Sequence, residues 1–106
     1  MISRNVSMHL KPNRVAEFTR TMDREVIPLL RKQKGFQDEL AFIAPGGLEA
    51  IGISLWDKSE DADAYSRNIY PQVLKALADV VDGTPRLQTF EVAKSTFHVL
   101  MARREV

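Results

Sequence analysis

The chain reads LEAIGISLW over residues 48–56, and this stretch decides the fold. Its side chains alternate with a period of two, which is typical of a β-strand. One face of the strand carries Ile51, Ile53 and Leu55. The other face carries Ala50, Gly52, Ser54 and Trp56. Because apolar residues occur on both faces, each face of the sheet needs a cover.

The preceding segment, residues 36–44, reads as a second strand. Pro45-Gly46-Gly47 separates it from residues 48–56. A short turn rich in proline and glycine is suited to a β-hairpin. The two segments therefore predict an antiparallel pair at the centre of the chain.

Farther upstream, residues 2–10 alternate in the same way and predict another strand. Lys11-Pro12-Asn13 breaks it, and residues 14–33 follow with apolar residues at steps of three and four, as in an amphipathic helix. Gly35 is a natural residue to follow the helix end. Pro28 lies inside the helix and is expected to kink its last two turns, because proline lacks a backbone donor.

Downstream of the hairpin, a second helix is expected to begin near Asp57 or Ser59 and to close at Gly83. Pro71 divides this helix into two segments. Residues 85–100 predict a long final strand, with a bulge near Ala93-Lys94. Residues 101–106 are expected to form a frayed tail.

The predicted order is βαββαβ, the split arrangement of ferredoxin-like α+β folds. Two helices then cover one face of a four-stranded antiparallel sheet. A second copy of the sheet is the simplest cover for the other face, so the chain is expected to form a homodimer. Residues 1–100 make one domain.

Composition narrows the functional classes. The chain has 106 residues, 15 Lys and Arg against 14 Asp and Glu, and no cysteine. Near-neutral charge disfavours a nucleic-acid partner. The absence of cysteine excludes disulfides and thiolate sites. No stretch predicts a membrane span or a signal peptide, so a cytoplasmic location is expected.

Four segments carry a family resemblance. They are Lys11-Pro12 after the first strand, Ile27-Pro28-Leu29-Leu30, Lys34-Gly35-Phe36, and Ile53-Ser54-Leu55-Trp56 followed by Ser59-Glu60-Asp61-Ala62. With them, residues 2–100 resemble the antibiotic biosynthesis monooxygenase-like domains of the dimeric α/β-barrel superfamily. The resemblance implies the dimeric ferredoxin-like fold. Its known enzymes include cofactor-free oxygenases of quinols and aromatic polyketides, and haem-degrading oxygenases; many members have no known reaction.

The haem-degrading relatives carry an active-site Asn, Trp and His. Asn5 matches the first position, but Tyr65 occupies the second and Lys75 the third. The resemblance therefore implies no haem, and no cofactor or metal is expected.

Small residues are the basis for predicting a cavity. We expect Ser3, Asn5 and Ser7 to share a face with Ala50, Gly52, Ser54 and Trp56. Small side chains on a covered face leave space unless larger ones fill it. That space is either a pocket with Trp56, Tyr65 and Tyr70 as substrate-binding residues, or it is filled by Phe18, Met22 and Leu77.

Asn5 and His9 are the candidate catalytic residues. Asn5 lies among small polar neighbours, and His9 has the same strand parity and carries an imidazole, a common general base in proteins. The structural alternatives are a hydrogen bond within the strand region for Asn5 and a solvated surface position for His9. His98 is a weaker candidate.

The leading functional hypothesis is a cofactor-independent monooxygenase acting on an aromatic or quinol-like small molecule. In such chemistry the electron-rich substrate itself reacts with oxygen, and the protein supplies a dry pocket and orientation. The alternative is a non-catalytic dimeric domain for ligand binding or interaction. An enclosed, partly polar cavity favours the first hypothesis, and a fully packed interior favours the second.

Overall fold

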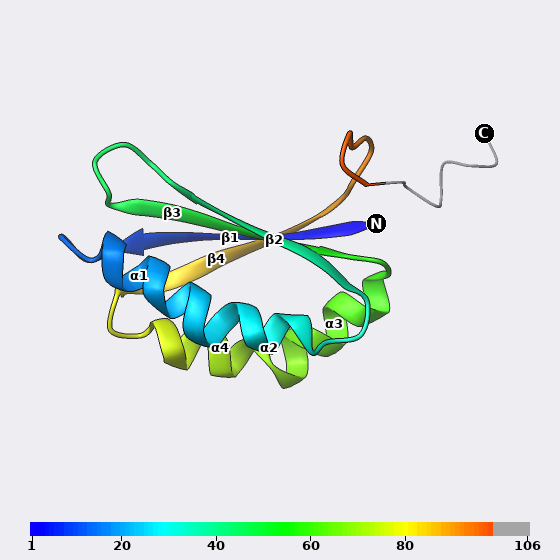
Figure 1. Cartoon of the computed structure of the whole chain (residues 1–106), viewed down its shortest axis with the longest axis horizontal. Coiled ribbons are helices and arrows are strands. Elements are labelled where there is room, and N and C mark those ends of the chain that lie inside the picture. The colour runs from blue at the N-terminus through cyan, green and yellow to red at the C-terminus, as the bar shows by residue number, and fades with distance from the viewer. Residues whose placement is uncertain (99–106) are drawn as a thin grey trace.

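A four-stranded antiparallel sheet forms one layer, and all the helices lie against one of its faces (Figure 1). The computed structural model describes residues 1–98. The strands run in the spatial order β2-β3-β1-β4. Their bounds are β1 Ile2–Leu10, β2 Phe36–Ile43, β3 Glu49–Trp56 and β4 Val81–Glu91. The helices are α1 Val15–Thr21, α2 Ile27–Arg31, α3 Ser59–Asn68 and α4 Tyr70–Leu77, with a π-helical turn η1 at Met22–Val26. The predicted ferredoxin-like α+β fold is confirmed.

Both predicted helices are interrupted close to their prolines. In the first helix, η1 comes immediately before α2, where Pro28 is among the first residues. Proline cannot donate to the carbonyl four residues earlier, and its ring crowds that carbonyl, so the preceding turn widens. In the second, α3 ends before Ile69, whose φ of −117° departs from the usual helical value, and Pro71 stands at the start of α4. The division at Pro71 was predicted.

The last strand differs from the prediction at both ends. It begins at Val81, and Gly83 (φ +80°) lies within it rather than closing the helix. A register irregularity against β1 occurs beside this glycine, between Ser7 and His9, and not near Ala93-Lys94. The strand stops at Glu91 because β1, its neighbour in the described sheet, begins at Ile2. Residues 99–100 of the predicted strand and the predicted tail lie outside the described residues.

Strand register defines two faces of the sheet. The inner face meets the helices and includes Arg4, Val6, Met8, Glu39, Ala50, Gly52, Ser54 and Leu87. The outer face lies on the opposite side and includes Ser3, Asn5, Ser7, His9, Leu40, Phe42, Ile51, Ile53, Leu55 and Phe90. Ser3 is opposite Leu55 and Ser7 opposite Ile51. The prediction that Ser3, Asn5 and Ser7 share a face with Gly52 and Ser54 is therefore wrong.

The hydrophobic core lies between the inner face and the helices. Phe18, Leu30, Trp56 and Val80 are its largest fully buried side chains. The core does not fill this layer completely, and the remaining space forms the candidate site.

Candidate functional site

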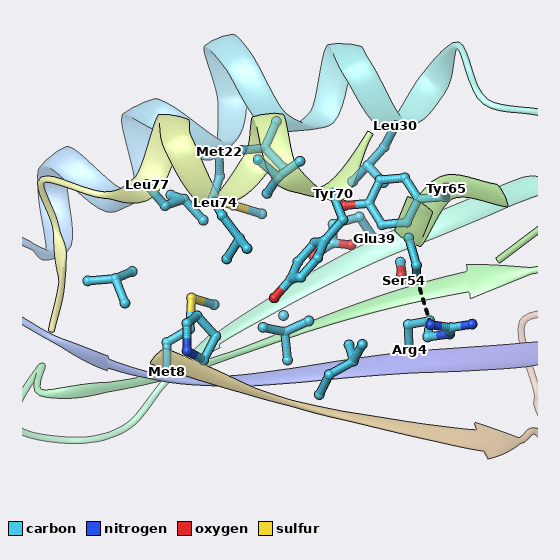
Figure 2. A pocket seen from close by; sticks show the side chains of 18 of the residues that line it. Arg4, Met8, Met22, Leu30, Glu39, Ser54, Tyr65, Tyr70, Leu74 and Leu77 are labelled. Atoms are coloured by element: carbon cyan, nitrogen blue, oxygen red, sulfur yellow. Dashed lines mark hydrogen bonds between the residues drawn. The ribbon is translucent and has the colours of Figure 1, made fainter. Parts of the chain in front are cut away.

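A cavity of about 330 Å³ lies between the sheet and the helices (Figure 2). Its floor is the inner face of the sheet. Its roof is formed by side chains of η1, α2, α3 and α4. Binding sites for small molecules occupy roughly 300–1,000 Å³, so this cavity suits a compact ligand. Most of its lining is apolar: Val6, Met8, Met22, Val26, Leu30, Val73, Leu74, Leu77, Val81 and Leu87.

Three polar side chains form a row across the cavity floor. Ser54 of β3 is paired with Glu39 of β2 on one side and with Arg4 of β1 on the other. Adjacent strands are about 5 Å apart, so the row spans the three strands over about 10 Å. All three residues line the cavity. We call Glu39, Ser54 and Arg4 the polar row.

Arg4 is held at one end of the polar row by contacts from α3. Its Nη1 donates to Ser66 Oγ at 2.6 Å, and its Nη2 pairs with the half-exposed Asp63 carboxylate. The Nε–H donor of Arg4 is buried and has no hydrogen-bond partner within the described residues. Buried donors are normally satisfied, so this unpaired donor is an exception at the Arg4 end of the polar row.

Glu39 stands at the other end of the polar row and is mostly buried. Burial, and to a lesser extent the nearby Asp38 carboxylate, raises the pKa of Glu39 to about 8. Gly52 leaves room for the carboxyl, because a Cβ atom there would lie 3.2 Å from Glu39 Oε2. At neutral pH the cavity therefore holds a carboxyl that is mostly protonated.

Two tyrosine rings line the cavity beside Glu39 (Figure 2). The Tyr65 and Tyr70 ring centroids are 6.2 Å apart, and Trp56 lies behind Tyr65 at 4.9 Å. Burial raises the pKa of both tyrosine hydroxyls, and the Glu39 charge adds to this effect at Tyr65. Both phenols therefore stay neutral at physiological pH. Trp56 Nε1 donates to Ser54 Oγ at 2.8 Å, which orients the middle residue of the polar row.

The structure brings together some of the predicted site residues and separates others. Tyr65 and Tyr70 line the cavity as predicted. The prediction that Trp56 lines the cavity is wrong, because Trp56 is fully buried and packs behind Tyr65 instead. The prediction that Asn5 lines the same cavity is wrong, because Asn5 lies on the outer face, where its Oδ1 accepts a hydrogen bond from Ser3 Oγ at 2.8 Å.

His9 is also on the outer face and is exposed. It borders a second hollow there, together with Ser7, Phe42, Ile51 and Arg86. His98 follows β4, and its Nε2 lies 3.7 Å from Asp38 Oδ2. The catalytic roles of Asn5 and His9 remain predictions, and neither residue contributes to the cavity between sheet and helices.

Glu39 and Arg4 were not identified from the sequence as site residues. Each is a charged residue in a segment predicted as a strand, and such residues usually face solvent. The small residues Gly52 and Ser54 did indicate from the sequence which face of β3 borders the cavity. The strand register needed to place Glu39 and Arg4 beside them is visible only in the folded sheet.

Two further features concern cofactors and membranes. In the described part of the chain, His, Asp and Glu side chains do not gather in groups of three or more that could hold a metal ion. Lys75, at the position where haem-degrading relatives carry a His, is exposed on α4 and does not line the cavity.

Among residues 1–98, no helix has the length and apolar character needed to cross a bilayer.

The fold and cavity define an α+β ferredoxin-like protein with a ligand-sized space between sheet and helices. No protein-family model matches the chain, and no curated protein matches it. Solved structures do match. SnoaB of Streptomyces nogalater, a cofactor-independent oxygenase, is 13% identical with a TM-score of 0.74, covering 90% of this chain and 95% of its own.

Three other similar structures come from different bacteria. The ActVA-Orf6 monooxygenase of Streptomyces coelicolor, solved with nanaomycin D, is 14% identical with a TM-score of 0.71, and the match covers 89% of this chain and 88% of that one. A protein of unknown function from Nitrosomonas europaea is 15% identical with a TM-score of 0.74, over 92% and 94% of the two chains. A structure described as a putative antibiotic biosynthesis monooxygenase from Bordetella bronchiseptica is 14% identical with a TM-score of 0.75, over 88% and 97% of the two chains, so this chain has the fold of that structure.

Proposed function

We propose that this protein is an enzyme that oxidises a small aromatic compound with dioxygen in the cavity between sheet and helices. The observation that carries the proposal is an apolar cavity of about 330 Å³ crossed by a polar row. Apolar walls with a few placed polar groups are typical of small-molecule sites. Two structures with the same fold are oxygenases by description, which supports the same class of reaction.

The cavity suits a flat ligand with a carbonyl oxygen. The Tyr65 and Tyr70 rings offer apolar surface for an aromatic ligand. The Arg4 guanidinium lines the cavity and would place positive charge near the carbonyl oxygen. In the proposed reaction a methylene carbon of the substrate becomes a carbonyl: one oxygen atom of O₂ enters the product, and the other leaves as water with the two hydrogen atoms of that carbon.

The alternative is a binding domain without catalysis. A ligand cavity alone is compatible with it. The polar row favours an enzyme, because it places a carboxyl with a raised pKa and a cationic donor on the same apolar floor.

Anthrone is a suitable probe, because it has a carbonyl and a methylene on opposite sides of one ring. We expect the protein to convert anthrone to anthraquinone faster than buffer does, with uptake of one equivalent of O₂. Product formation by chromatography and oxygen consumption measure this. With ¹⁸O₂, one labelled atom should enter the product. Saturable anthrone binding without turnover would contradict the proposal and support the binding domain.

A cavity-blocking variant provides the control. Leu87 lines the cavity and is 41% exposed, so Leu87→Trp can narrow the site without disturbing the core. Leu48, at 52% exposure in the hairpin loop, lies outside the cavity, so Leu48→Trp should retain activity. Equal activity in both variants would place the reaction elsewhere.

The outer face is the basis for proposing a homodimer. The helices all lie on the other side of the sheet (Figure 1). On the outer face, Leu40, Phe42, Ile51 and Phe90 are each 39–51% exposed. An apolar face of this kind marks an interaction surface, and the matching face of a second copy would cover it.

Sedimentation at micromolar concentration is expected to report twice the chain mass. Ile51→Glu would bury a charge in the proposed interface and should shift the protein to monomer. Leu48→Glu introduces the same charge at an exposed leucine of the hairpin loop and should leave the dimer intact. A wild-type monomer at all concentrations would contradict the proposed assembly.

A further inference from the structure

Glu39 is the only acidic residue among the described residues that line the cavity. Its carboxyl has no hydrogen bond or ion pair within residues 1–98, although the residue is partly buried. A structural buried carboxyl is normally paired or hydrogen-bonded. This one instead lines the cavity, beside Tyr65 and Tyr70 (Figure 2).

The strand pairing places the cationic side chain of Arg4 at a fixed separation from Glu39. Arg4 is two strands away in the polar row, with Ser54 between them. A flat ligand lying along the row would therefore meet a carboxyl at one end and a guanidinium donor at the other. This arrangement suits a ligand that loses a proton at one end and gains negative charge at the other.

We propose that Glu39 is the catalytic base of this site, and that it removes a proton from a weakly acidic C–H or O–H group of an aromatic ligand. The inference rests on the proposed function and adds the residue and the substrate class, an aromatic carbon or oxygen acid. For a C–H acid such as anthrone, the C–H bond breaks and the proton forms an O–H bond with Glu39. The electron pair of the C–H bond moves into the ring, and the carbonyl oxygen becomes an enolate oxygen.

Arg4 then stabilises the charge that develops. Its guanidinium lies at the opposite end of the row from Glu39 and is fixed by Ser66 and Asp63. A fixed positive charge near a developing oxyanion lowers the barrier to its formation. The resulting electron-rich anion is the species that would react with dioxygen.

The pH dependence follows from the groups that face Glu39. Arg4 from β1, Tyr65 from α3, Tyr70 from α4 and the neighbouring Asp38 are the titratable groups around it. With a pKa raised to about 8, Glu39 is a base only once its proton is lost. The rate should therefore rise with pH up to about 8.

Binding of 2-naphthol tests Glu39 without any turnover. Its neutral hydroxyl can donate to the ionised carboxylate, so calorimetry should show affinity rising by about tenfold or more between about pH 6 and about pH 8.5. In Glu39→Gln the change should be less than about twofold over the same range. The proposal would be overturned if the wild-type affinity for 2-naphthol did not change with pH, or if 2-naphthol did not bind saturably. It would also be overturned if the affinity of Glu39→Gln rose with pH as much as that of the wild type.

Turnover of anthrone provides the second measurement. Glu39→Gln should lower kcat by about 10²–10⁴-fold with little change in anthrone affinity, and Glu39→Asp should restore part of the rate. Glu60→Gln, at an exposed position of α3, is the charge-matched control. If Glu39→Gln turned over anthrone at the wild-type rate, the role of Glu39 would be overturned and the proposed oxygenase activity would stand. Absent turnover with pH-dependent naphthol binding would overturn the proposed oxygenase activity instead.

Discussion

Replacing Trp56 with alanine is expected to lower the free energy of unfolding by about 3–5 kcal/mol. The Trp56 side chain is fully buried and contacts Phe36 and Tyr65. Its removal leaves a void between sheet and α3, and Ser54 Oγ loses its donor. Trp56 is the only tryptophan, so unfolding in urea should be followed by circular dichroism rather than fluorescence.

Phe97→Ala is the matched control for this experiment. Phe97 is 91% exposed, so its truncation should change stability by less than about 0.5 kcal/mol. A Trp56→Ala protein with the wild-type urea midpoint would show that the core described around this ring does not support the fold.

Stability is expected to fall as the pH rises from about 5 to about 9, and Glu39→Gln should remove most of this fall. The folded protein retains the Glu39 proton up to about pH 8, whereas the unfolded chain releases it near the ordinary value of 4.5. Between these values the folded state binds more protons, so the free energy of unfolding decreases with pH. The total effect is on the order of a few kcal/mol.

Urea titrations at several pH values measure this effect. At about pH 9, Glu39→Gln should be more stable than the wild type, because it no longer buries an ionised carboxylate. Glu60→Gln removes the same charge from an exposed position of α3 and should follow the wild-type curve. Parallel curves for wild type and Glu39→Gln would mean that Glu39 does not titrate in a buried site.

The fold could be predicted from the sequence because local patterns and the proposed topology agree. Alternation defined β1 and β3 closely, and the prolines at 28 and 71 marked the helix interruptions. The end of β4 could not be predicted from its own residues. It depends on where the partner strand begins, which is a property of the assembled sheet.

The candidate site was only partly predictable, because it depends on strand register. A hairpin turn of three residues, 45–47, would place Glu39 opposite Ile53 on the outer face. The actual loop is one residue longer: Ala44 N–H donates to the Glu49 carbonyl, and Glu39 is opposite Ser54. A one-residue change in register moves every side chain to the other face. The pairing of β1 with β3 joins segments distant in sequence, so no turn indicated the face of Arg4 or Asn5.

The π-helical turn η1 has a consequence for how this cavity can change during evolution. A π turn holds one residue more than the α-helical turn it replaces. Deletion of one residue within Met22–Val26 would therefore leave a regular α-helix, while the sheet and its hairpin stay as they are. Met22 and Val26 both line the cavity, so such a deletion would rotate one relative to the other. The loss of a single codon in this helix would thus reshape the space that this protein offers to a ligand.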